Sequence, residues 1–183
     1  MRAVAAGIAT ALLLAGCGTT RYRPVSDWPV RIGPPYVVRG VTYIPAAQPG
    51  YDMVGQAGWY GSESGNRTAN GERFRPKGIS AAHPTLPLPS YVEVTALDSG
   101  RTILVRVNDR GPFARGRVID LSRGAAKSLG VMVQGHAAVR VRRVDPPERD
   151  RDRLRHGKPA ISRPDATPAT LKMLRARLAP PPR

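Results

Sequence analysis

The chain has 183 residues, a formal net charge of +16, and 41% hydrophobic but only 5% aromatic residues. This length accommodates one modest domain with flanking segments, and two full domains would be cramped. The single cysteine excludes a disulfide framework, a cysteine-based zinc site and an iron–sulfur cluster. With three scattered histidines besides, the composition predicts neither a metal site nor a cofactor.

Residues 1–16 predict a lipoprotein signal peptide, because a basic residue precedes a short apolar stretch that ends in small residues. The only cysteine, Cys17, follows Leu14-Ala15-Gly16 at the expected cleavage point. This pattern resembles the bacterial lipobox. The resemblance implies that Cys17 carries a diacylglycerol on its thiol and becomes the mature N-terminus. The alternative is a plain signal peptide in which the cysteine occurs by chance. By analogy with other bacterial lipoproteins, Gly18 favours the outer membrane, facing the periplasm.

Charge and proline content divide the rest of the chain. Residues 17–56 predict a lipidated linker with a possible hairpin over 35–45 that turns at Arg39-Gly40. Residues 145–183 are rich in proline and arginine, which predicts a mostly disordered basic tail. Leucines recur at helical spacing over 170–178, and a frayed, solvated tail is favoured over a basic amphipathic helix at an anionic surface.

Residues 57–144 contain the strand signals and predict a mainly β fold. A turn over 98–100 separates two β-rich runs of a hairpin. Ser122–Leu129 predicts the one clear helix, with Ser122 as its cap and Gly130 as its C-terminal glycine. Several short strands with one small helix indicate a compact β-barrel. The expected strands are 58–60, 91–97, 101–107, 117–121 and 138–144.

Five motifs in one order resemble the rare lipoprotein A family, over about Tyr36 to Val144. This resemblance implies a six-stranded double-psi β-barrel with one or two short helices. It also implies a lytic transglycosylase that cleaves the β-1,4 bond between N-acetylmuramic acid and N-acetylglucosamine of peptidoglycan, leaves 1,6-anhydromuramic ends, and prefers glycan without stem peptides. Expansins and some endoglucanases share the barrel, so the fold alone does not determine the chemistry. The motifs are Gly58-Trp-Tyr-Gly61, Thr68-Ala-Asn-Gly-Glu-Arg-Phe74, Ala81-Ala-His-Pro-Thr-Leu-Pro-Leu-Pro89, Val107-Asn-Asp-Arg-Gly-Pro-Phe113 and Val118-Ile-Asp-Leu-Ser122.

Glycosidic cleavage needs a carboxylic acid that protonates the leaving oxygen. The resemblance assigns this acid/base role to Asp109, with a turn residue bonded to its own backbone as the alternative. The resemblance also matches Glu72 to the family's essential glutamate, which implies that Glu72 orients substrate or stabilises the transition state. It matches His83 to the third polar group of the family site, where it is expected to hydrogen-bond Asp109 and set its protonation. A solvated loop glutamate and a satisfied structural histidine are the alternatives.

Further residues are predicted to bind substrate. Trp59 and Tyr60 are candidates for stacking on sugar rings, although core packing is equally compatible with their positions. Asp120 is interpreted as structural, near the positive end of the helix. Four arginines either line the groove or are surface charges. The predicted substrate-binding residues are Trp59, Tyr60, Asn70, Asn108 and Arg110, and the four arginines are Arg73, Arg75, Arg106 and Arg110.

The sequence departs from the family pattern at two places. Gly58 stands where the family carries serine, and no sporulation-related repeat (SPOR) domain is expected after residue 144, which puts septal recruitment in doubt. The alternatives to a transglycosylase are a non-catalytic, expansin-like glycan-binding lipoprotein and a hydrolase that pairs Asp109 with Glu72 or Asp120. Nucleic-acid binding rests only on the positive charge, and export and scarce aromatics argue against it. Peptidoglycan strands and the membrane are the expected partners.

Overall fold

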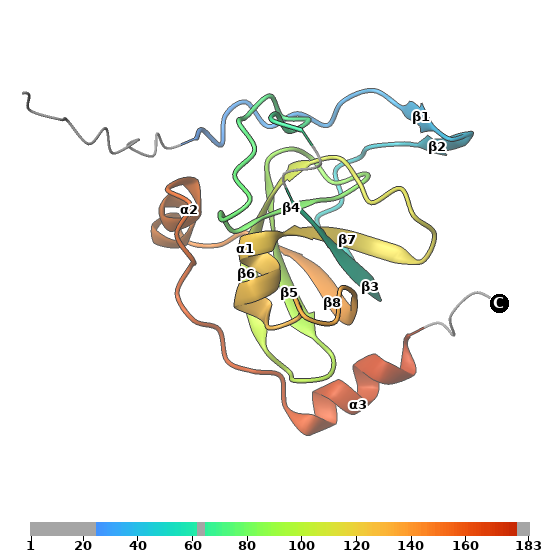
Figure 1. Cartoon of the computed structure of the whole chain (residues 1–183), viewed down its shortest axis with the longest axis vertical. Coiled ribbons are helices and arrows are strands. Elements are labelled where there is room, and N and C mark those ends of the chain that lie inside the picture. The colour runs from blue at the N-terminus through green and yellow to red at the C-terminus, as the bar shows by residue number, and fades with distance from the viewer. Residues whose placement is uncertain (1–24, 62–64, 179–183) are drawn as a thin grey trace, which may run out of the picture.

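The computed structural model describes residues 25–61 and 65–178. Six strands close a barrel in the order β3-β7-β4-β6-β5-β8 (Figure 1). The pairs β3–β7 and β4–β6 are parallel, and the remaining pairs are antiparallel. The predicted fold class, a mainly β protein with a six-stranded barrel, is therefore confirmed. The barrel strands are β3 (Asp52–Tyr60), β4 (Ser80–Ala82), β5 (Ser90–Ala96), β6 (Thr102–Asp109), β7 (Arg117–Ser122) and β8 (Ala137–Val144).

The barrel core is built from branched aliphatic side chains, which suit a pleated and buried surface. Most of the predicted strands appear within two residues of their expected bounds. β3 begins at Asp52, earlier than the predicted start of the barrel at residue 57. β4 was not predicted because its residues, Ser-Ala-Ala, are neither β-branched nor aromatic. Fully buried core residues include Val92, Val105, Val107, Ile119, Leu121, Val139 and Val141.

The predicted helix is confirmed as α1 (Arg123–Leu129), and its ends follow the expected chemistry. The Ser122 hydroxyl accepts a hydrogen bond from the Ala125 amide at 3.1 Å. Gly130 ends the helix in the left-handed region, with φ 85°. Gly124 lies so close to the preceding loop that a Cβ would be 2.3 Å from the Lys77 carbonyl oxygen. The helix therefore packs directly on backbone.

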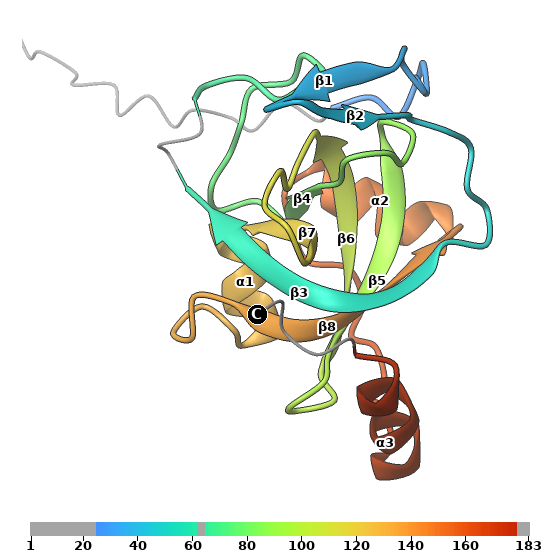
Figure 2. The ribbon, with the colours of Figure 1, turned by 90° about the vertical axis from the view of Figure 1, so that its right-hand side faces the viewer.

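The predicted hairpin is also present, as β1 (Tyr36–Val38) and β2 (Val41–Tyr43). Arg39 and Gly40 have positive φ, 50° and 78°, as a two-residue hairpin turn requires. The hairpin lies over one end of the barrel (Figure 2). Tyr36 stacks on Tyr43 with ring centroids 5.3 Å apart, and Phe113 contacts Tyr43 edge-on at 5.4 Å.

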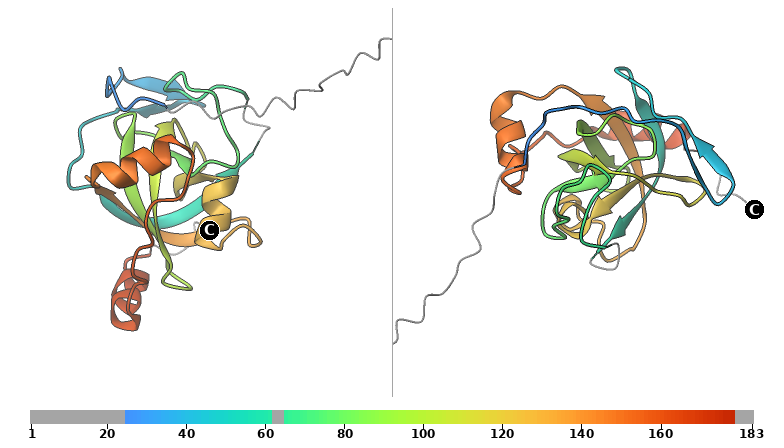
Figure 3. Two further views of the ribbon diagram at one scale, coloured as in Figure 1. Left: turned by 90° about the vertical axis from the view of Figure 1, so that its left-hand side faces the viewer. Right: turned by 90° about the horizontal axis from the view of Figure 1, so that it is seen from above.

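Residues 25–35, which the sequence predicted as part of a linker, pair with the barrel. Arg31 and Leu88 exchange backbone hydrogen bonds of 2.7 and 2.8 Å, so this segment adds a short bridge to a barrel loop. Its backbone crosses the barrel from beside α2 (Glu148–Arg155) toward β1 (Figure 3, right). Residues 1–24, which include the predicted signal peptide and Cys17, lie outside the described part of the chain.

The prediction of a disordered tail is wrong for residues 145–178, which contain two helices. Leu154 of α2 is buried in the main core. α3 (Pro168–Ala176) places Leu171 and Leu174 against Leu97, so the leucine spacing marks a packed helix instead of a frayed tail. Proline does not prevent these helices, because Pro168 occupies the first turn, where no amide donor is needed.

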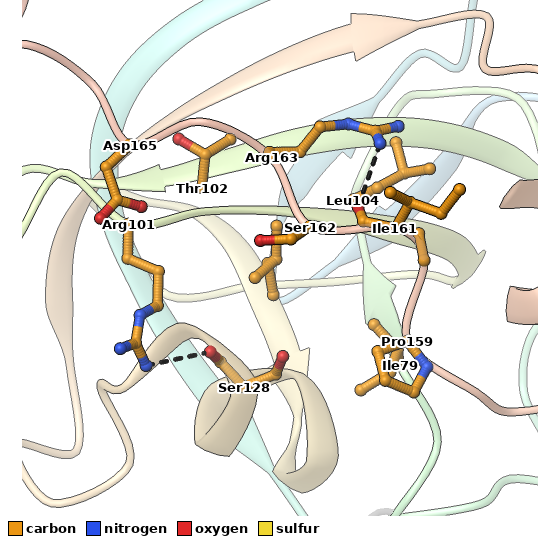
Figure 4. Close-up of a pocket in the computed structure, with 12 residues that line it drawn as sticks. Ile79, Arg101, Thr102, Leu104, Ser128, Pro159, Ile161, Ser162, Arg163 and Asp165 are labelled. Carbon is orange, nitrogen blue, oxygen red and sulfur yellow. Dashed lines mark hydrogen bonds between the residues drawn. The ribbon is translucent and has the colours of Figure 1, made fainter.

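A polar hollow lies between the segment that joins these helices, the start of β6 and the end of α1 (Figure 4). Arg101, Arg163 and Asp165 are among the charged residues that line it. Arg101 donates to the Ser128 carbonyl at 3.5 Å across it. In the described residues, no helix is long and apolar enough to cross a membrane.

The packing of α3 generates a first prediction. Leu174→Ala should lower the free energy of unfolding by about 2 kcal/mol, because it empties part of a small buried cluster. Met173, on the same helix, is 64% exposed, so Met173→Ala should change the stability by less than about 0.5 kcal/mol. Urea denaturation of both variants measures the difference. Equal effects would contradict the docking of α3.

Candidate active site

The loop over residues 67–73 is docked on the end of β6. Within it, the Thr68 amide donates to the Glu72 carbonyl at 2.9 Å, and the Gly71 amide donates to the Thr68 carbonyl at 2.8 Å. Gly71 has φ 81°, a backbone conformation that is unfavourable for residues with a side chain. The Asn70 amide then donates to the Asn108 carbonyl at 3.2 Å. This tight turn places Glu72 beside the last residues of β6.

The carboxylate of Glu72 is held by four donors. Arg106 donates from both terminal nitrogens, one to each Glu72 oxygen, at 2.8 Å. Asn70 donates to Oε1 at 2.9 Å and Asn108 donates to Oε2 at 2.8 Å. A two-point arginine–carboxylate pair is both strong and directional. Glu72 is therefore fixed in one orientation, and the two asparagine amides that were predicted to bind substrate bind Glu72 in this structure.

A β-bulge directs Asp109 toward the same end of the barrel. Ala81 of β4 pairs with Val107, whereas its neighbour Ala82 pairs with Asp109, so β6 carries one extra residue at Asn108. Side chains on a regular strand alternate, and Asp109 would then share the fully buried face of Val107. A bulge of this kind redirects the side chains that follow it, which is why bulges occur near active sites.

Asp109 is half-buried and has few stabilising partners. Its Oδ1 accepts hydrogen bonds of 2.8 Å from the amides of Ala69 and Arg110. Its Oδ2 accepts none from the described residues. Burial raises the pKa of the Asp109 carboxyl, and the two amides and the Arg110 charge offset this only in part. The group is thus held in place and favours its protonated form more than an exposed aspartate does.

His83 does not make the predicted hydrogen bond to the Asp109 carboxyl. Its ring is 1% exposed, and Nδ1 accepts from the amides of Thr85 and Leu86 at 3.2 and 3.0 Å. Desolvation and the Arg110 charge lower the pKa of His83 to about 3, so the ring is neutral. The two residues meet through their backbones, where the His83 amide donates to the Asp109 carbonyl at 3.0 Å. His83 therefore shapes the loop beside Asp109.

Three other predicted substrate-binding residues have structural contacts. Tyr60 is buried and stacks on Phe74 with centroids 4.9 Å apart, so its ring is not available for a sugar. Trp59 is half-buried against the main core. The guanidinium of Arg110 donates to the carbonyls of His83, Leu86 and Ile32, which ties the N-terminal segment to the loop over 83–86.

Asp120 lies on the other side of Ala82 from Asp109, because Ala82 pairs with both residues. Burial raises the pKa of the Asp120 carboxyl, and its Oδ1 lies 3.3 Å from Nη1 of Arg117. A Cβ at Gly58 would be 2.7 Å from this Oδ1 and 2.4 Å from the Arg117 nitrogen. The glycine therefore leaves room for this ion pair. Ser122 supplies the side-chain cap of α1, and Asp120 forms its ion pair with Arg117.

The sequence interpretation missed how central Arg106 is and did not consider Asp27. Arg106 is 2% exposed, and its Nε donates to the Asp27 carboxylate at 2.9 Å. One signal was present: Arg106 interrupts a continuous apolar strand in which both neighbours are buried valines. No sequence pattern marks Asp27, since it is 79 residues away from Arg106.

The raised pKa of Asp109 generates a prediction for Asp109→Asn. The folded state binds this proton more tightly than the unfolded state, so the ionised carboxylate weakens the fold as the pH rises through the folded pKa. The neutral variant should therefore match or exceed the melting temperature of the original protein at pH 7, and the difference should close below about pH 4. A variant that is less stable at pH 7 and recovers nothing in acid would contradict this reading.

Comparisons with known proteins support the barrel assignment. Residues 52–141 match the family model described as "Lytic transglycolase". The "Endolytic peptidoglycan transglycosylase RlpA" of Pseudomonas aeruginosa strain UCBPP-PA14 is 56% identical over 114 residues, which are 61% of this chain and 33% of that protein. The protein of the same name from Rickettsia felis is 36% identical over 150 residues, 70% of this chain and 66% of that protein.

Among solved structures, "Streptomyces papain inhibitor (SPI)" aligns with 55% of this chain and 100% of its own, at 25% identity and a TM-score of 0.46. The chain spans only about a third of the length of the Pseudomonas relatives. The match nevertheless includes all of β3 to β7 and most of β8. The barrel is thus a double-psi β-barrel of the lytic transglycolase family, and the chain belongs with the RlpA proteins.

Proposed function

We propose that this protein is a lytic transglycosylase that cleaves peptidoglycan between N-acetylmuramic acid and N-acetylglucosamine and leaves 1,6-anhydromuramic ends. The main support is Asp109, a carboxyl that two backbone amides fix in place and that burial keeps protonated more readily than usual. A general acid needs both properties. The names of the relatives point to the same activity.

In the proposed reaction, Asp109 first donates its proton to the glycosidic oxygen. The bond between that oxygen and the anomeric carbon of muramic acid breaks, and the leaving sugar keeps the proton as a hydroxyl. The C6 hydroxyl of the same muramic acid then bonds to the anomeric carbon and gives its proton to the Asp109 carboxylate. The proton balance closes without water, so one carboxyl serves as acid and then as base.

Glu72 has the complementary task in this proposal. Positive charge develops on the sugar ring as the glycosidic bond breaks. A carboxylate that is already oriented by Arg106 and two asparagines can stabilise that charge with little rearrangement. Asp109 and Glu72 therefore divide proton transfer and electrostatic stabilisation between them, and their different surroundings favour that assignment.

The product of digestion tests the proposal against its alternatives. The protein is incubated with purified sacculi, with and without prior amidase treatment, and the soluble products are identified by mass spectrometry. Anhydro ends released mainly from amidase-treated sacculi support the transglycosylase and its preference for strands without stem peptides. Reducing ends indicate a hydrolase, and binding without release indicates an expansin-like module. Either of these outcomes would overturn the proposal.

Substitution of the acid gives a quantitative prediction. Asp109→Asn should lower the rate of anhydro-product release at least about 100-fold, since positioned acid–base groups contribute about that much or more. In the original protein the rate should fall as the pH rises through the raised pKa of Asp109, because the starting form is protonated. Asp98→Asn, in an exposed turn, is the matched control and should keep full activity. Equal rates for the two variants would rule out Asp109 as the acid.

The proposal extends to the place of action. A lipid on Cys17 would hold the barrel at the outer membrane, facing the peptidoglycan, and several acyl chains make such an anchor durable. In cells that express the full chain, Cys17→Ser should move the protein from the membrane fraction to the soluble periplasmic fraction. Retention of the variant in the membrane pellet would contradict the lipid anchor.

A further inference from the structure

We propose that the N-terminal arm, residues 25–33, is a working part of the active site, because it fixes Arg106 as the positioning residue for Glu72. The inference rests on the proposed function for its activity test. It goes beyond the matched family region, which begins only at residue 52. The buried guanidinium of Arg106 contacts Glu72 along one edge and the arm along another.

Arg106 uses one edge for Glu72 and the other for the arm. Its Nη1 and Nη2 each donate to a Glu72 oxygen at 2.8 Å. Its Nε donates to Asp27 Oδ1 at 2.9 Å, and Nη2 also donates to the Ser26 carbonyl at 2.7 Å. A guanidinium is planar and rigid, so contacts on one edge determine the orientation of the other. Asp27 therefore acts on Glu72 without touching it.

The arm is itself held at both ends. Asp27 Oδ2 accepts from the Tyr91 hydroxyl at 2.7 Å and from Arg155 of α2 at 3.2 Å. Farther along, Arg31 exchanges two backbone hydrogen bonds with Leu88. The right-hand view of Figure 3 shows this segment crossing the barrel between α2 and β1. The position of Asp27 is thus determined by β5, by α2 and by the loop that precedes β5.

Asp27→Asn is the direct test, because asparagine keeps the size but removes the charge. In either orientation its amide nitrogen would face an arginine donor, Nε of Arg106 or Nη1 of Arg155, so the contact with Arg106 should loosen. A loosened Arg106 leaves Glu72 misoriented, and small errors in position are costly in catalysis. The kcat for release of anhydro products should fall about tenfold or more, whereas KM should change less than about twofold.

Asp52→Asn is the matched control, because Asp52 also forms an ion pair with an arginine, Arg140, on strands away from Glu72. It should keep the original kcat. If Asp27→Asn and Asp52→Asn have the same kcat, the arm does not act on the site and the proposal is overturned.

A double-mutant cycle on unfolding tests the arm independently of catalysis. No described hydrogen bond or ion pair joins Asp27 to Glu72 directly, and both bond Arg106. The effects of Asp27→Asn and Glu72→Gln on the unfolding equilibrium constant should therefore be non-additive by about threefold or more, as expected for residues in one network. Additive effects would overturn the proposal. If the original protein releases no anhydro products, the proposed function fails, and this cycle still decides whether the arm is coupled to Glu72 through Arg106.

Discussion

One buried positive charge organises the active end of this protein. The guanidinium of Arg106 lies almost fully out of water between Glu72 and Asp27. Removing a charge from water is costly, and loss of one partner from a buried pair typically costs about 3–5 kcal/mol. The loop over residues 67–73 and the N-terminal arm both supply a carboxylate to this strand, although they are far apart in the sequence, and Arg155 of α2 holds Asp27 in turn.

The two acidic residues of the site have opposite surroundings. Glu72 receives four side-chain hydrogen bonds from a cation and two amides. Asp109 receives two backbone amides and is otherwise penalised by burial, which raises its pKa. Both residues depend on the last positions of β6, where the bulge at Asn108 interrupts the alternation of the strand. The residues around a single irregularity in one strand thus give two carboxyl groups different electrostatic surroundings.

The parts of the fold with local signals were predictable from the sequence. Alternating β-branched residues located the strands, and Ser122 with Gly130 located α1, because caps and alternation act over a few residues. The tail was mispredicted because the stability of α3 comes from contact with Leu97, which no local pattern reveals. Motif similarity identified which residues surround the site but not how they face: His83 bonds backbone, and Tyr60 packs inward. Asp27 had no signal at all, because its significance depends on a distant arginine.

The segments outside the matched region determine where a stable fragment of this chain must begin and end. A fragment cut at residues 52 and 141, where similarity to the family model begins and ends, keeps β3 to β7 and most of β8 but loses Asp27 and Arg155. Half of the Arg106 guanidinium would then face solvent or an empty space, and the hairpin with its tyrosines would be missing as well. The evolutionary module and the physical folding unit have different borders in this chain. Shortening the chain to the matched region would expose to solvent the Arg106 charge, which the intact molecule buries.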